Sequence, residues 1–160
     1  DGGRPTFPNG CHVCEVEVDA ATGTVELLRY TVFDDVGRVI NPLLVKGQIH
    51  GGIVQGAGQA LMEDFVTDPE SGQVLTGSFA DYCMPRAADF CAFEVHGNAF
   101  PTAVNPLGVK GAGESGTVGA LAAVMSAIND ALSQEGCDYL QMPATPHRVW
   151  RAIRAARARA

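Results

Sequence analysis

Two stretches near the start of the chain show the alternation of apolar and polar positions that is typical of β-strands. In residues 11–18, valine and cysteine alternate in part with glutamate, which predicts a strand with one buried face. Residues 24–33 are rich in β-branched and aromatic residues, and the turn-forming segment 19–23 precedes them. We therefore predict a β-hairpin, ended by residues 34–37, whose two aspartates are expected to serve turn and capping roles.

Apolar residues at helical spacing predict a helix over about residues 43–64. This helix is unusually rich in glycine, and each glycine in a helix interior costs roughly 1 kcal/mol against alanine. Its glycines are Gly47, Gly51, Gly52, Gly56 and Gly58. Such a helix must gain from close approach, either to another backbone or to a bulky ligand.

Two further helices are predicted in the second half of the chain. Residues 117–132 carry one apolar stripe, with Ser115 or Thr117 as a cap and Gly136 just past the end. The stripe consists of Val118, Leu121, Ala122, Met125, Ile128 and Leu132. The last helix begins at Thr145-Pro146, a capping residue followed by a proline at the first helical position.

Short strands are expected over residues 73–79 and near residues 91–97, between the first and second helices. The order of elements is therefore mixed, and no internal repeat or linker divides the chain. With 160 residues, 46% of them hydrophobic, the chain is long enough for one real core. We predict an α+β fold, a small mixed sheet packed with helices, as one domain over residues 1–160.

Charge and hydropathy narrow the functional classes. The net charge of −7 lacks the basic footprint of a nucleic-acid-binding protein. No apolar run reaches about 18 residues, so no transmembrane helix and no membrane association are expected. The chain opens at Asp1 without a methionine or a visible signal peptide, which suggests a trimmed or partial chain.

The five cysteines are an odd number in a chain of ordinary size, which favours free thiols and a reducing, cytoplasmic compartment. Residues 11–14 form a C-x-x-C pattern, but the second ligand pair of a zinc or iron–sulfur site is missing. The preferred interpretation is that Cys11 and Cys14 are small residues of a strand.

A carboxylate surrounded by glycines is the most informative chemical feature. Glu114 lies in the segment 108–119, where an apolar helix begins. Residues 111–116 match the dinucleotide pattern G-x-G-x-x-G, but the preceding residues 101–108 contain two prolines and do not read as a strand. Glycines and free N–H groups at a helix start favour a large or anionic ligand. Glu114 is either a general base, if shielded from water, or an exposed carboxylate in a helix first turn.

Paired amides form a second constellation in the glycine-rich helix. Gln48 and Gln55 are two helical turns apart and share a face, so they can hydrogen-bond a heterocycle. His50 lacks a partner four residues on and is expected to be satisfied by a local contact rather than to bind a metal. A triad of Ser78, Asp81 and His50 lacks the G-x-S-x-G turn of a serine hydrolase.

Several segments, in order, resemble the molybdenum hydroxylases, the superfamily of xanthine dehydrogenase, aldehyde oxidase and carbon monoxide dehydrogenase. The similar segments are residues 47–61 (GQIHGGIVQGAGQAL), 76–86 (TGSFADYCMPR) and 105–114 (NPLGVKGAGE). The resemblance runs from residues 6–10 (TFPNG) to 145–150 (TPHRVW). It is to the C-terminal end of the large, molybdopterin-binding subunit.

This resemblance implies roles for individual residues. Glu114 would be the general base beside the molybdenum, without coordinating it. The cofactor would be a molybdopterin, in the cytosine dinucleotide form, and the complete enzyme would oxidise aldehydes, N-heterocycles or carbon monoxide. The residues expected to bind the cofactor are Gln48, Gln55, Lys110, Gly111 and Gly113.

The resemblance also implies partners. The expected partners are the upstream part of the large subunit, iron–sulfur and flavin (FAD) groups on other subunits or domains, and a small-molecule substrate. We expect the chain alone to be catalytically inactive. The alternative is a non-catalytic α+β assembly domain that retains only the fold.

Overall fold

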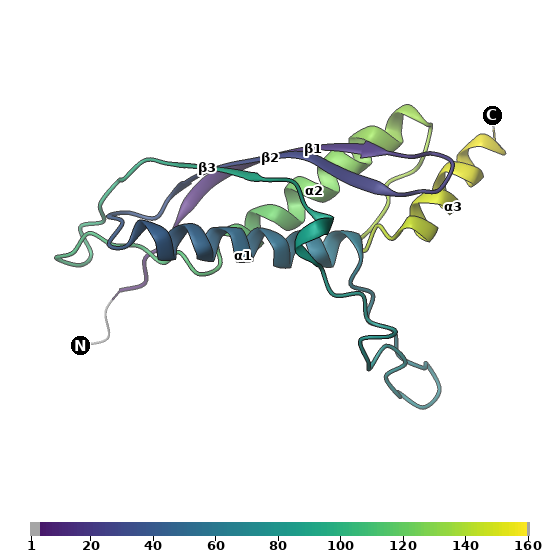
Figure 1. Ribbon diagram of the computed structural model, residues 1–160, viewed down its shortest axis with the longest axis horizontal. Coiled ribbons are helices and arrows are strands. Elements are labelled where there is room, and N and C mark those ends of the chain that lie inside the picture. The colour runs from purple at the N-terminus through teal and green to yellow at the C-terminus, as the bar shows by residue number, and fades with distance from the viewer. Residues whose placement is uncertain (1–3, 160) are drawn as a thin grey trace.

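The computed structural model describes residues 4–159 and confirms the α+β fold: three α-helices pack with a three-stranded mixed sheet (Figure 1). The sheet order is β1-β2-β3, with β1 and β2 antiparallel and β3 parallel to β2. In chain order the elements are β1 (Asn9–Val18), β2 (Val25–Asp35), α1 (Pro42–Leu61), the short 3-10 helix η1 (Ala87–Asp89), β3 (Phe93–Gly97), α2 (Ser115–Gln134) and α3 (Pro146–Arg157).

The predicted hairpin is confirmed, and its second strand runs to Asp35 rather than ending at residue 33. Asp19 holds the turn, because its Oδ1 accepts a hydrogen bond from the Ala21 N–H at 2.8 Å. Gly23 in the same turn has φ of +78°, and a Cβ there would lie 2.1 Å from the Pro146 carbonyl oxygen. The turn end of the hairpin therefore packs directly on the start of α3.

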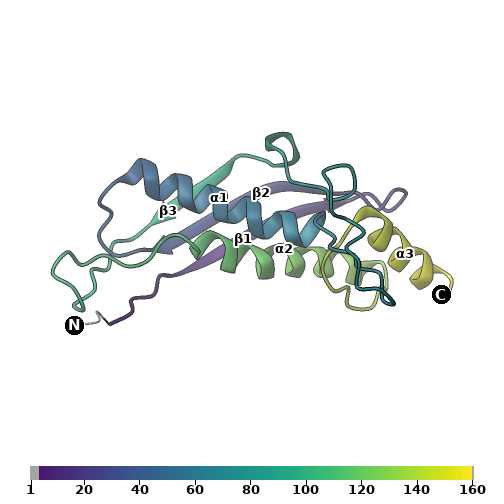
Figure 2. The same cartoon turned by 90° about the horizontal axis from the view of Figure 1, so that it is seen from below.

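Helices α1 and α2 cover one face of the sheet, and both views show them lying side by side across it (Figures 1 and 2). The core fills the space between these layers, and Leu27, Tyr30 and Val32 of β2 belong to it. The largest fully buried side chains are Tyr30, Val32, Ile53, Val124, Ile128, Leu132, Val149 and Ile153.

The glycines of α1 serve two different purposes. A Cβ on Gly52 would lie 2.9 Å from the Thr117 nitrogen, and one on Gly56 would lie 2.8 Å from the Thr117 carbonyl oxygen. The close approach predicted for this helix is therefore made, in part, to the backbone of α2. Gly47 and Gly51 instead meet no heavy atom within 4 Å among the described residues, so this side of α1 is open.

The ends of α1 differ slightly from the predicted range of 43–64. The Asn41 side chain caps the helix by accepting hydrogen bonds from the N–H groups of Leu43 and Leu44, at 3.1 and 3.2 Å. Pro42 follows at the first helical position, where its missing N–H costs nothing. The helix ends at Leu61, because the chain then turns into an irregular segment.

The strand predicted over residues 73–79 is wrong. Residues 62–86, here called the arm, leave the body of the molecule as a chain of turns (Figure 1). Within the described residues, a single bridge between Thr67 and Val74 is the only β-pairing in the arm. Apolar alternation alone did not make a strand here, because no sheet edge lies within reach of the arm.

The predicted helix 117–132 is confirmed and extends over Ser115–Gln134. Its buried face agrees with the predicted stripe at Met125, Ile128 and Leu132 but not in the first turns of the helix. Val118 is 72% exposed, whereas Gly116, Ala120 and Val124 are buried. Small residues, rather than large apolar ones, determine which face of α2 meets α1. The capping prediction is also wrong, because the N-cap residue is Glu114, while Gly136 follows the helix with φ of +72° as predicted.

The helix contact yields a test of the fold. We expect Gly56→Ala to lower the free energy of unfolding by about 1–3 kcal/mol, because its methyl group enters the α1–α2 contact. Gly51→Ala is the matched control: its methyl meets open space, so helix propensity makes it neutral or slightly stabilising. Urea unfolding measures both variants, and equal effects would contradict the proposed role of the contact.

Candidate functional site

Glu114 occupies the first position of the site, at the junction between the glycine-rich loop and α2. Its backbone has φ of −116° and ψ of −2°, and within the described residues its side chain makes no capping hydrogen bond. The carboxylate is exposed to solvent. The carboxylate therefore does not cap the helix, and it remains available to a ligand or a partner.

A pocket of about 610 Å³ lies beside this carboxylate. Its walls come from the N-terminal segment 6–10, the glycine loop, the first turns of α2 and two residues of the hairpin, His12 and Asp34. Gly111 and Gly113, two of the residues predicted to bind a cofactor, line it together with Glu114. The pocket combines an apolar surface with a few polar groups, as small-molecule sites generally do.

The contact between α1 and α2 brings the two predicted constellations together. A Cβ on Gly116 would lie 2.5 Å from the Ile49 carbonyl oxygen, so the two backbones touch beside Glu114. The Thr117 hydroxyl donates to Gln55 Oε1 at 3.3 Å, which places that amide next to the start of α2. Gln48 lies exposed on the same helix. The structure thus places Gln55 against the first turn of α2, which follows Glu114 directly.

Lys110 has a different environment from the glycines that follow it. Its ammonium pairs with Asp35, and the two side chains are only 14% and 11% exposed. Asp35 also accepts hydrogen bonds from the N–H groups of Gly37, at 2.9 Å, and Phe100, at 3.1 Å. Lys110 therefore fastens the loop that carries Glu114 to the end of β2.

These bonds have an electrostatic consequence. The Lys110 ammonium and the two N–H groups hold the pKa of Asp35 below its usual range. The turn role predicted for Asp35 is confirmed by its bond to the Gly37 N–H. The sequence did not reveal the ion pair, because Lys110 lies 75 residues away along the chain.

His50 does not behave as predicted. Its ring packs edge-on against Phe93, with ring centroids 5.5 Å apart, and its Nε2 has no hydrogen-bond partner within residues 4–159. Burial lowers the pKa of this imidazole. The triad of Ser78, Asp81 and His50 does not form either. Ser78 Oγ donates a hydrogen bond to Asp81 Oδ2 at 2.8 Å within the arm.

The cysteines fit the interpretation as small strand residues. Burial raises the pKa of the Cys14 thiol to about 12, which makes it a poor thiolate donor. All five thiols are free. Within the described part of the chain, no group of three potential metal-ligating side chains occurs, and no helix is long and apolar enough to cross a membrane.

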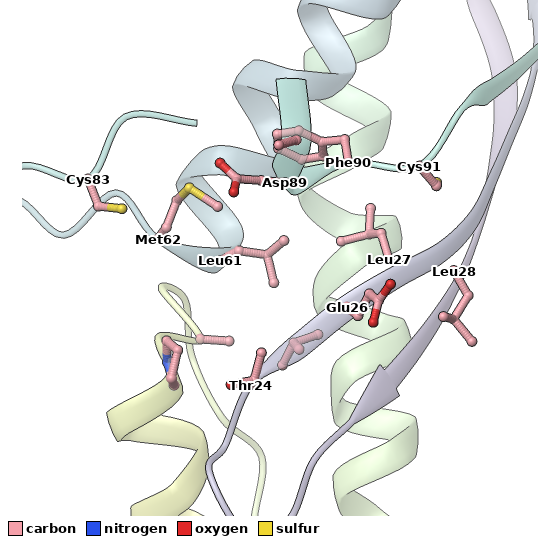
Figure 3. Close-up of a pocket in the computed structure, with 14 residues that line it drawn as sticks. Thr24, Glu26, Leu27, Leu28, Leu61, Met62, Cys83, Asp89, Phe90 and Cys91 are labelled. Atoms are coloured by element: carbon pink, nitrogen blue, oxygen red, sulfur yellow. The ribbon is translucent and has the colours of Figure 1, made fainter. Parts of the chain in front are cut away.

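A second hollow, of about 560 Å³, lies between β2, the end of α1 and the start of α3 (Figure 3). Its lining is mostly apolar and includes Leu27, Leu61, Met62 and Phe90. None of the predicted site residues contributes to it. Of the predicted site residues, Gly111, Gly113 and Glu114 line the pocket beside α2 instead, whereas Gln48, Gln55 and Lys110 line neither hollow.

The Asp35 bonds predict a pH dependence of stability. Because the pKa of Asp35 is lower in the folded chain, its ionisation stabilises the fold at neutral pH. This contribution is lost as the pH falls below about 3.9, the ordinary aspartate value, toward the lower folded pKa. We expect Asp35→Asn to lower Tm at pH 7 and the difference from the wild type to shrink in acid.

Thermal unfolding from pH 7 down to about pH 3 measures this difference. Asp130→Asn, at an exposed position of α2, is the control and should leave Tm nearly unchanged at every pH. A Tm difference for Asp35→Asn that stays constant across the range would contradict the role of its charge.

Comparisons with known proteins bear on this pocket. The sequence family described as molybdopterin cofactor-binding domain matches residues 1–91. The chain is 44% identical over 154 residues to the nicotine 6-hydroxylase large subunit of Paenarthrobacter nicotinovorans, covering 96% of the chain and 19% of that subunit. It is 35% identical to the carbon monoxide dehydrogenase large chain of Hydrogenophaga pseudoflava, covering 93% of the chain and 18% of that protein.

Solved structures agree with the sequence relatives. Reconstituted CO dehydrogenase from Oligotropha carboxidovorans matches with a TM-score of 0.90 at 32% identity, over 96% of this chain and 19% of that one. Quinoline 2-oxidoreductase from Pseudomonas putida 86 matches with a TM-score of 0.88 at 38% identity, over 93% and 19%. The chain thus spans about a fifth of the length of the relatives it matches.

Proposed function

The chain belongs to the molybdopterin cofactor-binding domain family, and we propose that it is the C-terminal part of a molybdenum hydroxylase large subunit. In this role it contributes the general base Glu114 and one side of the molybdopterin site. The observation that carries the proposal is the uncapped Glu114 carboxylate beside a glycine-lined pocket, in a chain whose relatives include a molybdenum-binding subunit of xanthine dehydrogenase and a Cu,Mo-containing CO dehydrogenase.

Exposed apolar side chains support a larger assembly. Phe79 in the arm is 88% exposed, and Leu43 and Leu44 at the start of α1 are also exposed. The two leucines and the arm lie at opposite ends of α1, so a partner that covers both exposed apolar positions would have to be large. The occupant we propose is the upstream part of the large subunit, with iron–sulfur and flavin groups on further subunits or domains receiving the electrons.

The open side of α1 fits a flat heterocyclic cofactor. Gln48, Gly51 and Gln55 lie on it, and a Cβ on Gly51 would meet no described atom within 4 Å. Glycine permits contact with the helix backbone, while the two amides supply donors and acceptors to a pterin. The bound molybdenum centre would supply the two-electron oxidation. Gly111 and Gly113 would line the cofactor's approach to Glu114, and Lys110 would hold their loop through Asp35.

Glu114 would act as the proton acceptor. Its carboxylate would take the proton from the oxygen nucleophile that attacks an electrophilic carbon of an aldehyde, an N-heterocycle or carbon monoxide. In the chain alone this carboxylate faces solvent, so the enclosing partner would have to exclude water from it. The free thiols fit the reducing, cytoplasmic compartment proposed for the enzyme. The cytosine dinucleotide form of the cofactor is part of the proposal on the family resemblance alone.

Substitution of Glu114 tests the base assignment. In the complete enzyme, Glu114→Gln keeps the shape of the side chain but removes the proton acceptor, so turnover should fall about 10²–10⁴-fold. Molybdenum content should stay at the wild-type level. Steady-state kinetics and metal analysis measure the two effects, with Glu70→Gln in the exposed arm as the control. Near-normal turnover of Glu114→Gln would exclude the base role.

The isolated chain gives an independent test. We expect the 160-residue chain alone to oxidise neither aldehydes nor N-heterocycles with a dye acceptor, because it supplies only one wall of the site. Co-expression with the upstream part of the large subunit should produce a complex that contains molybdenum. A complex without molybdenum would favour the non-catalytic assembly domain, and activity of the chain alone would contradict the shared site.

A further inference from the structure

A buried polar cluster beneath the start of α2 has no role in the proposed chemistry. The side chains of His12 and Asp34 are only 6% and 4% exposed, and Tyr30 is fully buried. The Tyr30 hydroxyl lies 2.6 Å from His12 Nδ1, and His12 Nε2 lies 3.5 Å from Asp34 Oδ1. Both ring nitrogens of His12 are therefore directed at partners on β2.

The direction of these contacts follows from the protonation of Tyr30. Burial raises the pKa of this phenol, so Tyr30 stays protonated and its hydroxyl donates a hydrogen bond to His12 Nδ1. In the neutral imidazole the other nitrogen then carries the hydrogen, which points toward Asp34. Asp34 Oδ2 has no hydrogen-bond partner within the described residues, so this carboxylate depends on His12 for its polar contact.

The cluster fits only because two neighbouring positions are glycines, where a side chain would clash with it. A Cβ on Gly119, in the second turn of α2, would lie 2.5 Å from two atoms of the His12 ring. A Cβ on Gly10, in β1, would lie 2.1 Å from Asp34 Oδ1. The imidazole is thus a rigid spacer that rests on β2 on one side and on the α2 backbone on the other.

This spacer lies close to the proposed base along α2. Gly119 is five residues after Glu114, or about 7.5 Å along the helix axis. Because Glu114 makes no capping bond among the described residues, packing against neighbours must fix the start of α2. On the α1 side, the backbone contact at Gly116 fixes the start of α2. On the sheet side, the contact between the His12 ring and Gly119 fixes it.

We propose that His12 is a positioning residue: held by Tyr30 and Asp34, its ring sets the height of the first turns of α2 over the sheet and thereby places Glu114. The inference rests on the proposed role of Glu114 as the base. A base displaced by about 1 Å loses rate rather than ligand affinity.

The experiment uses the holoenzyme that contains this chain. His12→Ala should lower kcat about 10- to 100-fold, with KM changed less than about twofold and molybdenum content unchanged. Hydrogen–deuterium exchange should become faster in residues 115–120 while the other elements keep their protection. His96→Ala, at an exposed position of β3, is the matched control and should change neither readout.

Gly119→Ala approaches the same contact from the helix side. Its methyl enters the space of the ring and lifts α2 without removing a buried hydrogen bond, so the same loss of kcat at constant KM is expected. In the double variant His12→Ala/Gly119→Ala the methyl finds room, and kcat should exceed the product of the two single effects. The Gly119→Ala variant remains informative if His12→Ala does not fold.

The outcomes separate the two proposals. If Glu114→Gln abolishes turnover while kcat survives in Gly119→Ala or His12→Ala, the positioning role is wrong and the base role stands. Loss of molybdenum together with faster exchange throughout the chain would reduce His12 to a general stabilising residue and overturn the inference. An active Glu114→Gln enzyme would overturn the base role and, with it, the purpose assigned to His12.

Discussion

The backbone contact between α1 and α2 is the constraint on which the site depends. Gly52, Gly56 and Gly116 let the two helices approach until backbone atoms touch, at distances where a single methyl group would not fit. This approach brings the start of α2 beside the middle of α1, and so Glu114 close to the helix that carries Gln55. The cost of several glycines in a helix is offset by this placement.

The loop before Glu114 is fixed by a different kind of interaction. The buried Asp35–Lys110 pair, with the N–H groups of Gly37 and Phe100, joins β2 to two segments that contain no regular structure. Removing one partner of a buried pair leaves an uncompensated charge, whereas replacing the whole pair by well-packed apolar residues is often neutral for stability. Its value is therefore in specifying one loop path, which a hydrophobic contact would define less sharply.

Periodicity was sufficient for the hairpin, the three helices and the α+β class, because these are local patterns. It failed for residues 73–79, where a strand needs a neighbouring edge that the arm does not reach. For α2 it was right in the C-terminal half, where Met125, Ile128 and Leu132 are buried, and wrong in the N-terminal half, where Val118 is exposed and Ala120 is buried. Helix–helix distance, which local hydrophobicity does not encode, decides which of these faces is buried.

The site residues that lie in local motifs could be predicted from the sequence, whereas their distant partners could not. Residues 111–114 and Gln55 lie within motifs that a sequence displays directly. The structure places the former at the pocket before α2 and the latter against Thr117 in the first turn of α2. The partners of Lys110 and His12 lie far away in sequence and emerge only from the packing of strands and loops.

In the function proposed above, the exposed carboxylate of Glu114 and the buried groups behind it would have complementary roles. The Glu114 side chain makes no capping hydrogen bond among the described residues, so bonds of that kind do not orient it. Precision must then come from the backbone beneath it, through glycine contacts on one side and a rigid ring on the other. In this fold the buried polar groups position α2 and do not enclose Glu114. Water would therefore have to be excluded by the partner that covers this face.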